Sequence, residues 1–432
     1  MIMADYPRIA SFKTAADFRK HIETLGIKLD VDDSILPASE SPLAQSLEWN
    51  GRTIGNRWCV LPMEGWDCLP DGAPSELTRR RWMNFATGGA KLLFGCEACA
   101  VMQTGKSNTR QFMITEKTLP AIKALREEMM AAHKEKFGTC EDFIVGLQLT
   151  HSGRYSHPND DAKLESVTAY SHPLLDERFH CTEKNVVSDA EIKNIVTAFG
   201  KAAQLAQKAG FDFVDVKMAH GYLGHEFLSA FTRPGPYGGS FENRTRFFRE
   251  VVETIRKAAP GLTIATRLSL FDCLPFEPGP DRVGIPMERG NVRVGNYKYA
   301  FGGDGTGLGY DLTEPLKFLE MVHDMGINLV CMLALEVPAS VPAWCFFCAS
   351  HWQVLSVPVA NRIADATAEF LGLLPARQYR DCYELRTSPA QRSRPSVEDQ
   401  HEDNPVWLQS ACAALGVAFG YRNSIEREVL SM

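Results

Sequence analysis

The sequence predicts an α/β protein built on a parallel sheet. Between about residue 58 and 332, short apolar runs alternate with longer segments of helical period, a pattern typical of parallel strands joined by crossover helices. Two connections from strand to helix, 150–187 and 271–313, are long, although a structural link needs only a handful of residues. Long connections on one side indicate a working face at the carboxyl ends of the strands, as in an α/β barrel.

Six strand–helix units can be marked. The predicted strands are 58–62, 91–94, 143–149, 213–217, 263–268 and 328–332. The predicted helices are 77–87, 119–134, 189–208, 241–258 and 315–325. Ser188 precedes Glu191 by three residues, which predicts a capping box at the start of the third helix.

Composition excludes several classes of protein. The 432 residues are 45% hydrophobic and 23% charged, which rules out a disordered chain or a coiled coil. The net charge is −7 and the basic residues are scattered, so we expect no nucleic-acid partner. The start lacks a signal-peptide pattern and no run approaches the roughly 18 apolar residues of a membrane span. We therefore expect no membrane partner, a cytoplasmic location, and reduced, mostly buried thiols for the 12 cysteines.

The chain changes character after about residue 335. Residues 336–432 contain no Lys and only three Gly, whereas residues 1–335 hold 18 Lys and 30 Gly. We therefore divide the chain into an α/β domain, 1–335, and an atypical segment, 336–432. This segment is interpreted as a divergent ending or as a tail read in a shifted frame.

Polar residues stand where the core strands should end. Gln148, Lys217 and Arg267 each follow an apolar run, and burying such groups unpaired would cost on the order of a few kcal/mol. The runs LPME (61–64) and CEAC (96–99) are also polar at predicted strand ends. These side chains are expected to meet at the mouth of the sheet.

The loop after the fourth strand carries a candidate catalytic group. Asp215 and Lys217 are two residues apart and should face the same side of their strand, and a simple salt bridge between them is one interpretation. His220 and Tyr222 follow within five residues of Lys217. Lys217 and His220 could hold a carbonyl oxygen while Tyr222 supplies a proton. The alternative is that His220 and Tyr222 are ordinary packing residues.

The run AHGYLGHEFLSAFTRPGPYGGSFENRTRFF, at 219–248, resembles the signature of the old yellow enzyme family of NADH:flavin oxidoreductases. The runs NRWCVLPMEGWD (56–67) and QLTHSGR (148–154), with the arginine of ATRLS, support the resemblance, which covers about residues 50–335. The first half is more similar to the bacterial branch. The family fold is an eight-stranded (β/α) barrel, a TIM barrel, that holds FMN at its mouth and uses NADH or NADPH as reductant.

The resemblance implies a set of flavin-binding positions. Pro62 and Met63 would lie along the isoalloxazine ring, with Ala98 beside it. Gln148 would bind the pyrimidine edge, and Arg267 would lie near N1 and O2, where a cation stabilises the negative charge of the reduced ring. A structural ion pair is the alternative for Arg267.

The resemblance also implies roles on the substrate side. Lys217 and His220 match the pair that grips the substrate oxygen, although the family has His at the first position. Tyr222 matches the proton donor, and Arg233 matches an arginine that could reach substrate or NAD(P)H. The implied reaction transfers hydride from reduced flavin to an activated alkene, an enone or enoyl compound, as the small-molecule substrate.

The sequence departs from the family near its end. The glycine-rich FMN phosphate segment is not found after residue 335, and the last two barrel strands cannot be marked there. Cys345 and Cys348 lack the spacing of an iron–sulfur site, so no metal is expected. A catalytically silent or FMN-deficient ligand-binding barrel and a flavoenzyme acting on amines remain as alternatives, and a homo-oligomer is an open option.

Overall fold

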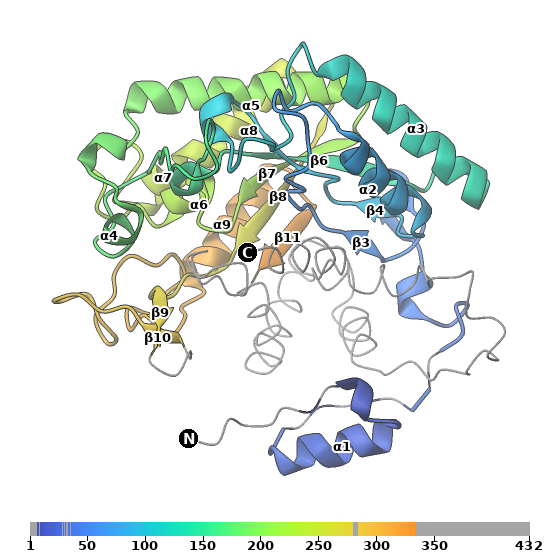
Figure 1. Ribbon diagram of the computed structural model, residues 1–432, viewed down its shortest axis with the longest axis horizontal. Coiled ribbons are helices and arrows are strands. Elements are labelled where there is room, and N and C mark those ends of the chain that lie inside the picture. The colour runs from blue at the N-terminus through green and yellow to red at the C-terminus, as the bar shows by residue number, and fades with distance from the viewer. Residues whose placement is uncertain are drawn as a thin grey trace, which may run out of the picture.

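A curled parallel sheet forms the centre of the molecule (Figure 1). The structure, a computed structural model, describes residues 7–333 except residues 8, 28, 30, 32, 35 and 280–283. Neighbouring strands run parallel in the order β11–β8–β7–β6–β4–β3, and β5 also pairs with β6. The strands are β3 (Cys59–Val60), β4 (Leu92–Leu93), β5 (Ala98–Ala100), β6 (Ile144–Thr150), β7 (Phe213–Met218), β8 (Thr263–Ser269) and β11 (Val330–Leu333). All six predicted strands are therefore confirmed.

Helices cover the outer face of this sheet (Figure 1). They are α2 (Glu76–Thr87), α3 (Leu119–Phe137), α5 (Asp189–Ala209), α8 (Arg246–Ala258) and α9 (Thr313–Asp324). The predicted helix 241–258 is divided into α7 (Phe241–Arg244) and α8 at Thr245, whose hydroxyl bonds back to the carbonyl of Phe241 at 2.9 Å. Such back-bonding competes with the regular helix pattern.

The predicted capping box of α5 is present. The side chain of Ser188 accepts from the backbone N–H of Glu191, and the backbone N–H of Ser188 donates to the Glu191 carboxylate at 2.8 Å. The helix ends at Gly210, which adopts a left-handed conformation. The α5 boundaries were therefore predictable from local chemistry.

The sheet encloses apolar side chains at the amino ends of its strands. Trp49 of the hairpin β1 (Leu47–Trp49) and β2 (Arg52–Ile54) packs edge-on against Phe213, with ring centroids 5.7 Å apart. Phe94 packs on the same ring at 5.6 Å. Gly146 leaves room for that ring, because a Cβ there would lie 2.2 Å from it. Because these apolar rings fill the amino ends of the strands, polar side chains inside the sheet are found at the carboxyl ends.

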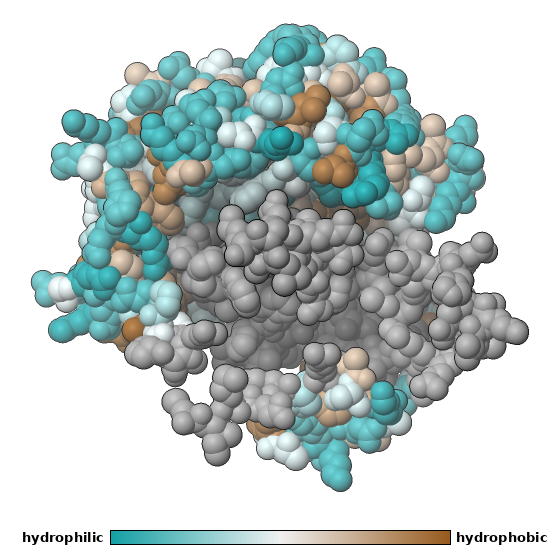
Figure 2. All heavy atoms as spheres, in the orientation of Figure 1, coloured by the Kyte–Doolittle hydropathy of each residue, from teal (hydrophilic) through white to brown (hydrophobic). Residues whose placement is uncertain are grey.

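Several elements were not predicted. Apart from a ten-residue helix that precedes the sheet, they are short or lie within long connections. They are α1 (Ala15–Thr24), β1, β2, β5, α4 (Leu175–Phe179), α6 (Leu223–Leu228), β9 (Phe276–Pro278) and β10 (Gly284–Pro286). Strands β9 and β10 pair antiparallel in the connection between β8 and α9. The surface over the outer helices is mostly hydrophilic (Figure 2), as expected for a layer that faces solvent.

The fold is an α/β barrel, and the described residues supply six successive parallel strand positions of it. The described residues do not include the predicted segment 336–432, which holds Cys345, Cys348 and the positions expected for the last two strands. No helix of the described part has the length and apolar character to cross a membrane. Four of the eight cysteines in that part are buried.

Candidate active site

Strand register brings the predicted polar residues side by side at the carboxyl ends of the sheet. Gln148 on β6 is in register with Ala98 on β5 and with Asp215 on β7. Two residues further along β7, Lys217 is in register with Arg267 on β8. Because alternate residues of a strand face the same side, the sheet presents two adjacent layers of polar side chains.

The first layer is a buried amide–carboxyl pair. The side-chain amide of Gln148 donates to Oδ2 of Asp215 at 2.5 Å, and both residues are completely buried. Burial raises the pKa of Asp215 to about 7, although the Gln148 hydrogen bond and the cations of Arg267 and Lys217 oppose the shift. Oε1 of Gln148 and Oδ1 of Asp215 have no hydrogen-bond partner among the described residues.

Arg267 connects β8 to the segment after β3. Its Nη1 donates to the carbonyl of Pro62 at 3.2 Å, and its Nε has no partner in the described part of the chain. Within that part, no carboxylate forms an ion pair with Arg267. The structural ion pair considered for this residue is therefore not observed among the described residues.

Lys217 lies in a buried, charged position. Its ammonium is 3.8 Å from Oε1 of Glu64 and 3.5 Å from the centroid of the Tyr222 ring, a cation–π contact. Burial lowers its pKa to about 8, and Glu64 opposes that shift. Among the described residues Lys217 pairs with Glu64, and the simple Asp215–Lys217 salt bridge considered as an alternative is not observed there.

The loop after β7 places His220 and Tyr222 beside Lys217. His220 and Gly221 both have a positive φ, 67° and 63°, which is unusual for a residue with a side chain. The backbone N–H of His220 donates to Oγ of Ser269 at 3.2 Å, and that of Gly221 donates to Nδ1 of His225 at 3.0 Å. Two elements, β8 and α6, thus hold the loop in this conformation.

The two side chains of this loop keep neutral forms at neutral pH. Burial, together with the positive charges of Arg267 and Lys217, holds the pKa of His220 well below its usual value. Burial and the neighbouring carboxylate of Glu64 raise the pKa of Tyr222 well above its usual value. Tyr222 therefore retains its proton, and its hydroxyl donates to Oε1 of Glu64 at 2.7 Å.

Glu64 is a site residue to which the sequence analysis assigned no role. Its Oε1 receives the hydroxyl of Tyr222, and its Oε2 accepts from Ser107 and from the indole N–H of Trp66 at 3.1 Å. The polar ending of the LPME run marked the position. Nothing in the sequence indicated that it would meet Tyr222, 158 residues away.

The remaining predicted positions fall into two groups. Ala98 is buried in β5, and its carbonyl accepts from the Gln111 side chain at 2.9 Å; Met63 follows Pro62 and is half-buried. Arg233 instead donates to the carbonyls of Ala169 and Val187 at 2.7 and 2.8 Å and pairs with Asp189.

Among its described contacts, Arg233 meets none of the other predicted site residues. The structure therefore does not bring it together with Lys217 and Tyr222, and its predicted role with substrate or NAD(P)H is left without a contact.

The strand-end residues fit the polar edge of a flavin ring. The pyrimidine part of FMN offers acceptors and an N–H donor, and the unpartnered Oε1 of Gln148 and Nε of Arg267 are a matching acceptor and donor. A buried arginine also suits a ring that gains negative charge on reduction. The predicted phosphate segment lies outside the described residues.

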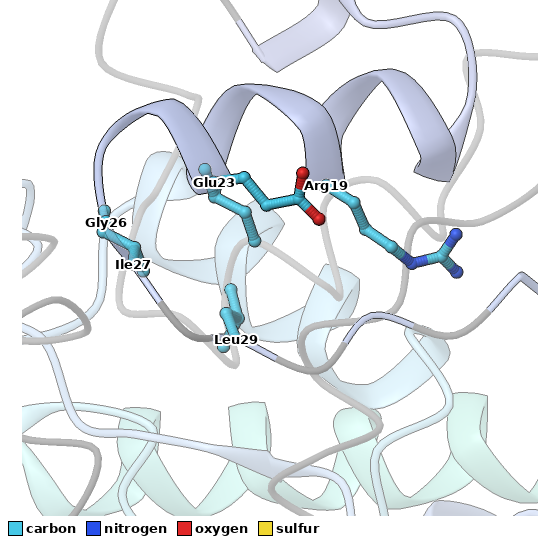
Figure 3. A pocket seen from close by; sticks show the side chains of 6 residues that line it. Arg19, Glu23, Gly26, Ile27 and Leu29 are labelled. Atoms are coloured by element: carbon cyan, nitrogen blue, oxygen red, sulfur yellow. The ribbon is translucent and has the colours of Figure 1, made fainter.

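A separate hollow lies on the amino-terminal segment. Figure 3 shows Arg19 and Glu23 on helix α1, with Ile27 and Leu29 on the chain that follows it. Arg19 pairs with Asp33 at 2.8 Å. None of the predicted site residues lines this hollow.

The geometry agrees with the family to which the sequence matches. Residues 45–283 match the NADH:flavin oxidoreductase / NADH oxidase family, more than half of the chain. The chain belongs to this family, which is one of FMN oxidoreductases, and the old yellow enzyme resemblance is confirmed.

Curated relatives with similar sequences are NADPH dehydrogenases. The chain is 38% identical over 286 residues to an NADPH dehydrogenase of Bacillus subtilis strain 168, covering 64% of this chain and 69% of the relative. It is 31% identical over 229 residues to an NADPH dehydrogenase of Geobacillus sp. strain WCH70, covering 52% and 62%. Another relative, from Clostridium acetobutylicum, is 36% identical over 211 residues, with 57% of its length covered. The chain thus spans less than two thirds of the length of two of these relatives.

Solved structures share the fold. A 2-naphthoyl-CoA reductase complexed with 2-naphthoyl-CoA matches with a TM-score of 0.50 and 18% identity, covering 72% of this chain and 44% of that one. This likeness supports the barrel architecture alone.

Proposed function

We propose that this protein is an FMN-dependent NAD(P)H oxidoreductase that reduces an activated alkene conjugated to a carbonyl group. The observation that carries the proposal is the meeting of Lys217, His220 and Tyr222 beside Gln148 and Arg267, in a chain of the NADH:flavin oxidoreductase family. When bound, FMN supplies two-electron transfer between the reduced nicotinamide and the alkene. The domain boundary near residue 335 and the cytoplasmic location are part of the same proposal.

In this proposal Gln148 and Arg267 bind and orient the ring. The acceptor of Gln148 and the donor of Arg267 are free to bind its pyrimidine edge, as far as the described residues extend. Arg267 also adds a fixed positive charge where the ring becomes electron-rich. Pro62, Met63 and Ala98 supply the main-chain and apolar contacts that position the ring.

Lys217 and His220 act on the substrate carbonyl. Both are donors in a largely buried site, where hydrogen bonds to a developing oxyanion are stronger than in water. Withdrawing electrons through the carbonyl makes the β-carbon of the alkene electrophilic. Lys217 adds a full charge to this donor pair, which favours substrates with a strongly polarised oxygen.

Tyr222 holds the proton that completes the reduction. Its raised pKa keeps the hydroxyl protonated, and the α-carbon of the substrate receives that proton while the β-carbon receives the hydride equivalent. The phenolate that remains lies next to the ammonium of Lys217, 3.5 Å from the ring centroid, which offsets the repulsion from the Glu64 carboxylate until solvent restores the proton.

The test separates the two halves of the reaction. We expect purified protein to be yellow, to bleach anaerobically with NADPH or NADH, and to recover its colour on addition of 2-cyclohexenone. Tyr222→Phe should bleach at the wild-type rate but recover its colour roughly 100-fold more slowly, since general-acid catalysis typically contributes 10²–10⁴-fold.

Three outcomes would contradict the proposal. Protein that stays colourless after FMN is added would indicate a silent binding barrel. Recovery of colour with methylated amines but not with the enone would indicate an amine flavoenzyme. Equal recovery rates for wild type and Tyr222→Phe would remove Tyr222 as the proton donor.

A further inference from the structure

Glu64 is the acceptor on which the catalytic donors converge. The hydroxyls of Tyr222 and Ser107 and the indole of Trp66 all donate to its carboxylate, and the ammonium of Lys217 lies 3.8 Å from Oε1. Its side chain is only 10% exposed. Three donors and an adjacent cation hold this carboxylate in one orientation.

We propose that Glu64 is a positioning residue that fixes the hydroxyl of Tyr222 and keeps Lys217 in its charged form. This inference rests on the proposed function and extends it to a residue in the segment after β3. Glu64 does not itself transfer the proton; it acts through the two residues that would touch the substrate.

The first part of the role concerns orientation. A tyrosine hydroxyl rotates freely unless a partner holds it, and the bond from Oη to Oε1 of Glu64 fixes where the phenol lies. The carboxylate is itself held by Ser107, whose hydroxyl also accepts from Asn108 at 3.2 Å. Tyr222 is thereby held in place from the β3 side of the barrel.

The second part of the role concerns charge. The charged and titratable groups that face Lys217 are Glu64 after β3, Asp215 on the same strand, Arg267 on β8, and His220 and Tyr222 in the loop after β7. Arg267 and burial both favour the neutral amine, and His220 is neutral. The pKa of Asp215 is raised to about 7, which weakens its negative charge near neutral pH. Glu64 is therefore the main group that raises the pKa of Lys217 against burial and Arg267.

The experiment compares Glu64→Gln with the wild-type holoenzyme. The amide can still accept the Tyr222 hydroxyl but carries no charge, so the pKa of Lys217 should fall. In a plot of the enone reduction rate against pH, the rate falls on the alkaline side as Lys217 loses its proton. We expect this alkaline limb to move to lower pH by about one unit in Glu64→Gln. Glu64→Asp retains the charge and should keep the limb near its wild-type position, with a reduced rate because Tyr222 is less well held.

Ser107→Ala is the matched control, because it removes one hydrogen bond to the carboxylate without altering the charge. Its alkaline limb should stay where it is in the wild type. A limb that moves equally in Ser107→Ala and Glu64→Gln, or in neither, would overturn the charge role of Glu64.

A binding measurement tests the same point without turnover. At pH 6, where Lys217 is protonated, Glu64→Gln should bind 4-nitrobenzoate about tenfold more tightly than wild type, because the site has lost a negative charge beside Lys217. The neutral isostere 4-nitrobenzamide should bind both proteins equally. Equal affinities for the anion would overturn the inference.

The two proposals fail separately. If Glu64→Gln binds 4-nitrobenzoate more tightly than wild type but wild type does not reduce the enone, the proposed function is refuted and the coupling of Glu64 to Lys217 stands. Active wild-type protein with no anion-binding difference and no movement of the limb would refute the coupling alone.

Discussion

Burial is the largest cause of the pKa shifts of single residues in this site. Lys217, Asp215 and Tyr222 are all shifted towards their neutral forms by desolvation as the largest cause. For Lys217 the shift brings the pKa to about 8, so its charge is lost within the range where enzymes are commonly assayed. A lysine in water would keep its charge throughout that range.

A pH dependence follows for Lys217. Because its pKa is lowered to about 8, the ammonium is present below that pH and is lost as pH rises through it. We expect the rate of enone reduction to fall above about pH 8 in the wild type. Lys217→Met should be slower by roughly 100–1000-fold at neutral pH, since a preorganised donor to an oxyanion is lost, and its pH–rate profile should show no alkaline limb near pH 8.

Steady-state rates from pH 6 to 10 provide the measurement. His220→Asn, which keeps a donor but cannot titrate, is the matched comparison and should retain the limb. If the limb persists unchanged in Lys217→Met, another group is responsible for it.

At the scale of elements, predictability depended on how strongly each segment was constrained locally. Strands such as β6 and β7 are buried on both faces, so their continuous apolar runs were readable in the sequence. Helix α5 carries both a capping box and a terminal glycine. By contrast, β9 and β10 are three residues each in a connection without apolar period, and their pairing with each other defines them.

The cap of α5 provides a stability prediction. Ser188→Ala removes the side-chain acceptor for the N–H of Glu191 and should lower the free energy of unfolding by about 1 kcal/mol. Ser171→Ala, at an exposed position outside a helix, should change it by less than about 0.5 kcal/mol. Urea denaturation of both variants gives the comparison, and equal stabilities would show that the cap contributes nothing.

At the scale of the whole molecule, the site is assembled from segments far apart in sequence. The residues of one strand end, such as Asp215 and Lys217, were predictable because their spacing alone places them on one face. The partner of Lys217 was not, because Glu64 reaches it only when the first strand position curls round to face the fourth. Hydrophobic periodicity predicts single helices and strands. The curling of the sheet into a barrel brings together residues, such as Glu64 and Lys217, that no local sequence pattern relates.

The central claim concerns the whole barrel mouth: the strand-end arginine and glutamine bind a flavin. Direct titration of FMN into stripped protein, followed by flavin fluorescence, tests it most directly. We expect wild type to bind FMN and Arg267→Met to bind it roughly 10–100-fold more weakly, as expected for loss of a charge-assisted hydrogen bond. Arg80→Met, at an exposed position on the outer helix α2, should bind like wild type. Equal affinity of wild type and Arg267→Met, or no binding by wild type, would contradict the claim.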